Sequence, residues 1–147
     1  MEVKRKLYEG VVVPTALYGS ETWGLREEER RKLDVFEMGC LRSICGVTLW
    51  DRVRNEEVKR RTQVERKLSS RVDQRVLGWF GHMERMEEKR MIKRAMNSDI
   101  EGTRLRGRPK LGWMDGVARA LRERGMSVEQ GRENARDRRV WKMVMNS

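Results

Sequence analysis

The sequence predicts an all-α protein, an irregular array of about six to eight helices with a basic extended loop near residues 97–110. Apolar residues recur at intervals of three and four along most of the 147-residue chain, which is the spacing of one face of an α-helix. No segment alternates convincingly between apolar and polar residues, and no Asn-Gly hairpin turn occurs. The sequence therefore gives no indication of a sheet.

The N-terminal part of the chain contains three predicted helices. Residues 2–13 place several aliphatic side chains on one helical face, and Pro14 is expected to end this helix because the residue before a proline is disfavoured in the helical conformation. Residues 26–45 keep a helical period, and Gly46 is a suitable C-terminal stop. Asn55 is the expected N-cap of a short third helix.

The longest predicted helix covers residues 64–85. Its opposite face is basic and includes Arg71 and Arg75. Gly78 and Gly81 lie inside it, and each is expected to cost about 1 kcal/mol relative to alanine or to allow close packing of another helix. The apolar face consists of Val64, Leu68, Val72, Val76, Trp79, Phe80 and Met83.

Helical patterns continue towards the C-terminus. One helix is predicted over 87–96, and another runs from Trp113 to a stop at Gly125. Ser127 is the predicted N-cap of a tail helix, because a glutamine three residues later completes a capping box. This tail helix is expected to continue through Trp141. Trp79, Trp113 and Trp141 are interpreted as core residues, whereas Trp23 and Trp50 are left open between core packing and base stacking.

Glycine, proline and polar residues between 97 and 109 mark the one candidate boundary in the chain. The predicted organisation is a helical region over 1–96, a basic Gly/Pro-containing loop over 97–110 and a C-terminal helical region over 111–147. We expect the three segments to form one continuous unit.

The charge of the chain indicates a polyanionic partner. Its net charge is +11 with a pI near 10.3, so contacts with nucleic-acid phosphates and release of counterions are expected. The alternative is a basic surface that is only solvated. Cys40 and Cys45 lack zinc-ligand spacing and are expected to be reduced, mostly buried thiols of an intracellular protein, nuclear or cytoplasmic. The apolar runs are too short to cross a membrane.

No catalytic constellation is evident in the sequence. His82 is the single histidine and is expected to be partly buried. Ser20 and Ser43 have no other histidine with which to build a catalytic triad. Phosphate-binding glycine loops and paired aspartates are missing. We therefore predict no catalytic residues, no metal site and no cofactor.

The candidate binding residues lie in the loop, where four cations occupy alternate positions: Arg104, Arg106, Arg108 and Lys110. In an extended chain such residues point to one side and could meet successive phosphates. The core Arg106-Gly-Arg-Pro-Lys110 is also similar to an AT-hook, which binds the minor groove of A·T-rich DNA. A solvated linker is the third reading. Arg71 and Arg75 are weaker candidates for phosphate contacts.

An ordered series of short blocks resembles a known family. The blocks are Leu17-Tyr-Gly-Ser-Glu-Thr-Trp23, Phe36-Glu37, Leu41-Arg-Ser-Ile44, Gly46-Val-Thr48, Asp51-Arg-Val-Arg-Asn-Glu-Glu57, Leu77-Gly-Trp-Phe-Gly-His82, Arg85-Met86, Gly107-Arg-Pro109, Trp113-x-Asp115-x-Val117, and Ala135-Arg-Asp-Arg138 with Trp141. In this order they are similar to the C-terminal region, thumb and post-thumb, of reverse transcriptases from LINE-type non-LTR retrotransposons. The resemblance covers nearly the whole chain.

The resemblance implies a thumb-like role for residues 1–96 and a fragment that binds RNA or RNA/DNA duplex mostly through phosphates. The family's catalytic [FY]-x-Asp-Asp motif belongs to the palm, upstream of the matched region, and the sequence does not contain it. The fragment is therefore expected to be no enzyme on its own, with the palm region as a second partner. The alternatives are an AT-hook-like DNA-binding module and a non-functional remnant of a decayed element. The oligomeric state is left open.

Overall fold

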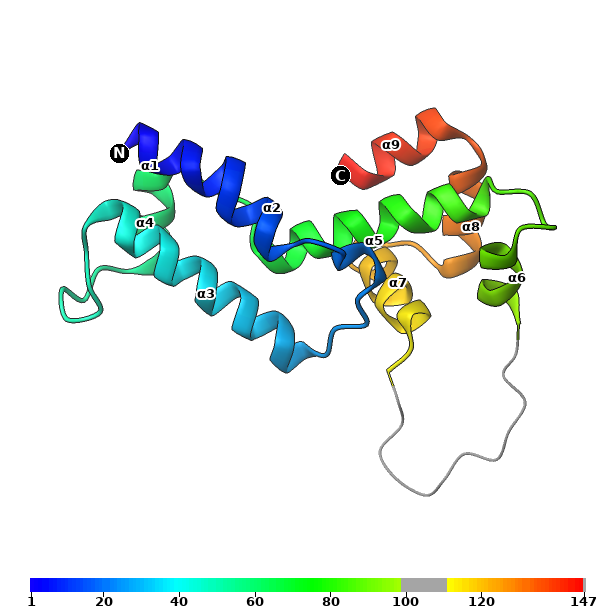
Figure 1. The fold of residues 1–147 in the computed structure, drawn as a ribbon, viewed down its shortest axis with the longest axis horizontal. Helices are drawn as coiled ribbons and strands as arrows, with labels where there is room; N and C mark the ends of the chain where they lie inside the picture. The colour runs from blue at the N-terminus through cyan, green and yellow to red at the C-terminus, as the bar shows by residue number, and fades with distance from the viewer. Residues whose placement is uncertain (99–110, 147) are drawn as a thin grey trace, which may run out of the picture. The chain divides into compact units, whose positions relative to one another are not determined.

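The computed structural model describes residues 1–98 and 111–146 (Figure 1). Every regular element within these ranges is helical, which confirms the predicted all-α class. The chain divides into two compact units: unit 1 comprises Met1–Ser20 and Leu25–Val72, and unit 2 comprises Glu21–Gly24 and Asp73–Ser147. The predicted loop over 97–110 lies almost wholly outside the described residues.

The first helical segment of unit 1 continues past Pro14, so the prediction that this residue ends the helix is wrong. Helix α1 (Glu2–Leu7) leads into a π-helical turn (Tyr8–Val12), which leads into α2 (Val13–Ala16) without a break. Proline cannot donate a hydrogen bond to the carbonyl four residues earlier and its ring collides with it. The wider π-turn lies where that carbonyl stands, and single π-turns of this kind occur inside α-helices.

Helix α3 (Glu27–Cys45) matches the predicted helix over 26–45. At its start the carboxylate of Glu29 accepts a hydrogen bond from the backbone N–H of Arg26 at 2.7 Å. At its end Gly46 has a left-handed backbone with φ 67°, a conformation that glycine adopts without a Cβ penalty. Helix α4 (Asn55–Thr62) begins at the residue that was expected to cap it.

The start of helix α5 (Leu68–Glu84) is bound by two carboxylates of α3. Asp34 accepts hydrogen bonds from the backbone N–H and the hydroxyl of Ser69, at 3.1 and 3.0 Å, and Glu37 accepts one from the N–H of Leu68 at 3.4 Å. The first N–H groups of a helix have no partner within the helix. These long-range contacts fix the first turn of α5 four residues later than the sequence predicts.

Glu37 is buried and also accepts a hydrogen bond from the hydroxyl of Tyr8 at 3.1 Å. Burial raises the pKa of the Glu37 carboxyl, an effect that the hydrogen bonds from Tyr8 and Leu68 oppose. Burial and the neighbouring Glu37 also raise the pKa of Tyr8. Unit 1 thus has a buried polar contact that joins its first helical segment, α3 and the start of α5.

Unit 2 contains the rest of α5 with α6 (Met91–Asn97), α7 (Trp113–Arg122), α8 (Val128–Arg136) and α9 (Arg138–Asn146). Its largest buried side chain is Trp141, whose indole N–H donates to the carbonyl of Leu77 at 3.0 Å. The core predicted around α5 and α7 is confirmed for Val76, Phe80, Met83, Val117 and Leu121. Leu77 and Ala120, which were not predicted, are also buried.

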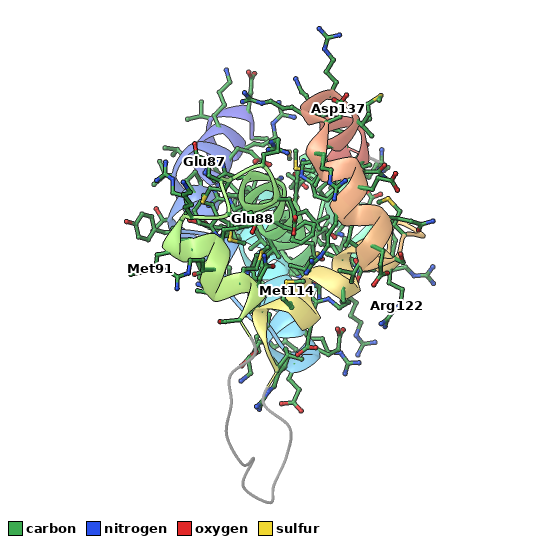
Figure 2. All side chains as sticks on the ribbon, turned by 90° about the vertical axis from the view of Figure 1, so that its right-hand side faces the viewer. Glu87, Glu88, Met91, Met114, Arg122 and Asp137 are labelled. Atoms are coloured by element: carbon green, nitrogen blue, oxygen red, sulfur yellow. The ribbon has the colours of Figure 1, made fainter. Side chains whose placement is uncertain are left out.

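The predicted capping box at Ser127 is confirmed: its hydroxyl accepts from the N–H of Gln130 at 3.2 Å, and the Gln130 side chain accepts from the N–H of Ser127 at 2.9 Å. The prediction of one tail helix is wrong, because the chain breaks between α8 and α9. Asp137 lies at the break (Figure 2) and accepts hydrogen bonds from the N–H groups of Arg139 and Val140, at 2.6 and 3.2 Å. Asp137 therefore caps a second helix.

Candidate nucleic-acid interface

The four main candidate residues, Arg104, Arg106, Arg108 and Lys110, lie outside the described residues. The structure does describe the segment that follows them. The indole N–H of Trp113 donates to the backbone carbonyl of Glu21 at 2.8 Å, and the Asp115 carboxylate accepts from the N–H of Gly112 at 2.7 Å. Because Val117 and Leu121 are fully buried, the residues after the loop are fixed in the core of unit 2.

The two weaker candidates have different surroundings. Arg71 is partly buried and forms a two-pronged ion pair in unit 1: its two terminal nitrogens donate to the two carboxylate oxygens of Glu9, each at 2.7 Å. These hydrogen bonds raise the pKa of Arg71. A guanidinium whose fork is occupied by a carboxylate has less to offer a phosphate. Arg75 is exposed on α5, as a phosphate contact requires.

The exposed cations of α4 are largely paired. Arg60 and Arg61 both bind the carboxylate of Glu57, at 2.8 and 2.7 Å. Their hydrogen bonds lower the pKa of Glu57 to about 2. A basic run in the sequence can therefore contain ion pairs within one helix, although the single carboxylate of Glu57 offsets only one of these two positive charges.

The loop between α3 and α4 has a feature that sequence reasoning left unresolved. Trp50 and Leu49 are highly exposed at its tip, and the exposed cations Arg52 and Arg54 follow closely. The signal in the sequence was a tryptophan in the segment between two predicted helices. In contrast to Trp50, Trp141 is buried in the core as predicted. Trp79 and Trp113, which were also predicted to be core residues, are only half-buried. Trp23 is half-buried as well.

His82 is exposed and not partly buried as expected. It lies against Trp79 on α5, with 5.3 Å between the ring centroids. The period of α5 places His82 just off the buried stripe that contains Phe80 and Met83. Cys40 and Cys45 are half-buried free thiols rather than mostly buried ones. Across the two described ranges no cluster of three or more His, Cys, Asp or Glu side chains could hold a metal ion.

One comparison with known proteins gives a relative. The chain is similar to an uncharacterised transposon-derived protein of Caenorhabditis elegans, with 24% identity over 152 aligned residues that cover 98% of this chain. The chain is thus related to a transposon-derived protein. It spans about half the length of that relative, 54%. No protein-family model matches the chain, and no solved structure matches it. In the described part of the chain no helix is long and apolar enough to cross a membrane.

Proposed function

We propose that this chain is the non-catalytic, nucleic-acid-binding C-terminal part of a LINE-type retrotransposon reverse transcriptase. In this role it contacts the phosphates of template RNA or of primer–template duplex. The chemistry of polymerisation is assigned to a palm region with an Asp-Asp pair, a pair that this sequence lacks. The contribution of this chain is therefore electrostatic and positional.

The observation that carries the proposal is the similarity to a transposon-derived protein along 98% of the chain. It supports a mobile-element origin. The ordered series from Leu17-Tyr-Gly-Ser-Glu-Thr-Trp23 to Trp141 resembles a reverse transcriptase and is the reason for proposing this family among mobile-element proteins. The helical architecture is compatible with a thumb and the segment that follows it.

Charge supports the binding role. The chain has 34 Lys and Arg residues against 23 Asp and Glu residues. Several exposed cations are paired with carboxylates, such as Lys6 with Glu2 and Arg31 with Glu27, yet a net charge of +11 remains. Such an excess raises the local concentration of a polyanion and gives binding with little sequence readout. The loop over 97–110 concentrates four cations without an intervening carboxylate between Gly102 and Met114.

A fluorescence anisotropy titration of the full chain tests this role. The probes are single-stranded RNA, an RNA/DNA duplex, and A·T-rich and G·C-rich DNA duplexes of equal length. We expect binding to all of them with dissociation constants of about 1–100 µM at physiological salt, the range of phosphate-dominated binding. An acidic polypeptide of matched charge serves as the control for simple charge attraction and should bind more weakly.

The other outcomes separate the remaining hypotheses. A strong preference for the A·T-rich duplex, lost when a minor-groove ligand competes, would support the AT-hook module suggested by Arg106-Gly-Arg-Pro-Lys110. Indifference to every nucleic acid would contradict the proposed function and favour a remnant without a binding role.

A further inference from the structure

The loop over 47–54 in unit 1 presents an aromatic side chain to solvent. Trp50 is 93% exposed and its neighbour Leu49 is 77% exposed. No other large hydrophobic side chain in the described ranges is as exposed as Trp50. Keeping an indole in water forgoes the favourable free energy of burying a large apolar side chain. A surface function is a reason for such a placement.

The backbone of the loop is held in place by hydrogen bonds within the loop and from α3. The carboxylate of Asp51 accepts from the N–H and the hydroxyl of Thr48, at 2.6 and 2.9 Å. Arg42 of α3 donates to the carbonyl of Val53 at 3.0 Å and to the side chain of Asn55 at 2.7 Å. The position of Trp50 therefore needs little further ordering when a partner binds, which lowers the entropic cost of binding.

The charge around Trp50 is positive. Asp51 is the one acidic residue of the loop, and its carboxylate accepts a hydrogen bond from the N–H of Thr48. Arg52 and Arg54 are exposed, and neither side chain has an ion pair within the described residues. Arg52 has a left-handed backbone with φ 52°, a conformation uncommon for arginine and found more often at functional sites. An exposed indole in the same loop as two guanidinium groups that have no ion pair in the described part of the chain is complementary to bases and phosphates together.

We propose that Trp50 stacks on an unpaired base of a single-stranded nucleic acid while Arg52 and Arg54 bind the flanking phosphates. Aromatic side chains next to a cationic groove are the features that bind single strands without sequence preference, because every base has a π-face. A duplex keeps its bases stacked inside and offers the indole no such face. This inference rests on the proposed function and adds to it a preference for unpaired bases at one defined loop.

The test compares the full-length wild-type chain with Trp50→Ala, Trp50→Phe and Tyr18→Ala. Tyr18 is an aromatic of the same unit that is 85% exposed, so its substitution controls for the loss of an exposed ring elsewhere. The probes are a single-stranded oligonucleotide and an abasic strand of the same length and charge. We expect Trp50→Ala to weaken binding to the normal strand about 5-fold to 140-fold, the effect of losing one stacked base.

The control variants and the abasic strand also have defined expected results. Trp50→Phe should retain most of the affinity, and Tyr18→Ala should retain all of it. On the abasic strand wild type and Trp50→Ala should bind equally, because the phosphate contacts remain. Substitution of Arg52 and Arg54 by Gln should reduce the salt slope on the single strand by about 1.4, since each phosphate contact contributes about 0.7.

Failure of this inference is distinguishable from failure of the proposed function. If wild type binds both strands and Trp50→Ala binds them equally well, the stacking inference is overturned while nucleic-acid binding stands. Equal weakening on the normal and the abasic strand would also overturn it and would favour a structural role for Trp50. A wild-type chain that binds neither strand would contradict both proposals and leave Trp50 as a contact for a protein partner.

Discussion

Substitution of Gly81 by Ala is expected to destabilise unit 2 by about 3–5 kcal/mol, the scale of losing a buried tryptophan from a core. A Cβ atom at Gly81 would lie 2.0 Å from Nε1 and 2.4 Å from Cδ1 of Trp141. The indole has little room to yield, because it is 1% exposed, donates a hydrogen bond to Leu77 and packs against Phe80 with 5.8 Å between ring centroids. The methyl group would therefore displace Trp141 from its site.

Gly78 provides the matched control for this substitution. It lies three residues earlier on α5, and a Cβ there would meet only Met145 at 3.7 Å, an ordinary contact. Gly78→Ala should thus leave stability unchanged or raise it by about 1 kcal/mol through helix propensity. Urea unfolding of both variants, followed by tryptophan fluorescence and near-ultraviolet circular dichroism, measures the difference. Equal stability of the two variants would show that Trp141 does not pack on Gly81.

Substitution of Lys93 by Met is expected to cost about 3–5 kcal/mol, the scale of leaving a buried charge without its partner. Lys93 on α6 is 3% exposed, and its ammonium donates to the carboxylate of Glu84 at 2.8 Å and to the Glu84 carbonyl at 3.3 Å. In the variant Glu84 would keep only the longer contact with Arg132, at 3.7 Å. A desolvated carboxylate would then remain largely unpaired.

The double variant Glu84→Met with Lys93→Met should recover most of the lost stability, because replacing both charges of a buried pair by apolar groups of similar size is often neutral. Lys89, in the turn before α6 that also contains Glu87 and Glu88 (Figure 2), is exposed. Lys89→Met therefore serves as the control, with an effect within about 0.5 kcal/mol. Thermal unfolding of wild type and the three variants measures how much of the lost stability the double variant recovers. A double variant as unstable as Lys93→Met alone would contradict the account.

The parts of the fold that the sequence predicted well are those decided by local chemistry. The end of α3 at Gly46 and the capping box at Ser127 follow from backbone conformation and short-range hydrogen bonds. The core positions of Val117 and Leu121 follow from helical periodicity. From the sequence, Gly81 could either weaken the helix or allow close packing of another helix. The position of Trp141 against Gly81 in the structure shows that it allows close packing.

The errors arose where a local signal was overridden or overlooked. The first helix passes Pro14 because a π-turn accommodates the proline. The tail helix breaks because Asp137, inside an otherwise helical pattern, accepts the N–H groups of the next helix. For the candidate site, the sequence identified cations but could not tell a paired one from an unpaired one. Arg71 binds Glu9, a residue 62 positions away in the chain. A contact over that separation cannot be predicted from the spacing of residues in the sequence.

The central claim is that this chain binds nucleic-acid phosphates through the loop cations Arg104, Arg106, Arg108 and Lys110. The fourfold alanine variant of these residues lowers the net charge from +11 to +7. The matched control replaces four cations that are already paired with carboxylates and lowers the charge by the same amount; these are Lys6, Arg31, Arg60 and Arg61. Any difference between the two variants therefore reports local contacts and not overall charge.

The decisive measurement is the salt dependence of binding to single-stranded RNA for wild type, the loop variant and the control. We expect the loop variant to lose about 2.8 from the slope of log affinity against log salt, about 0.7 for each phosphate contact. Between about 50 and 200 mM salt, wild type should then lose about 50-fold more affinity than the loop variant. The control should keep a slope within about one contact of wild type. A loop variant with the wild-type affinity and slope would contradict the claim.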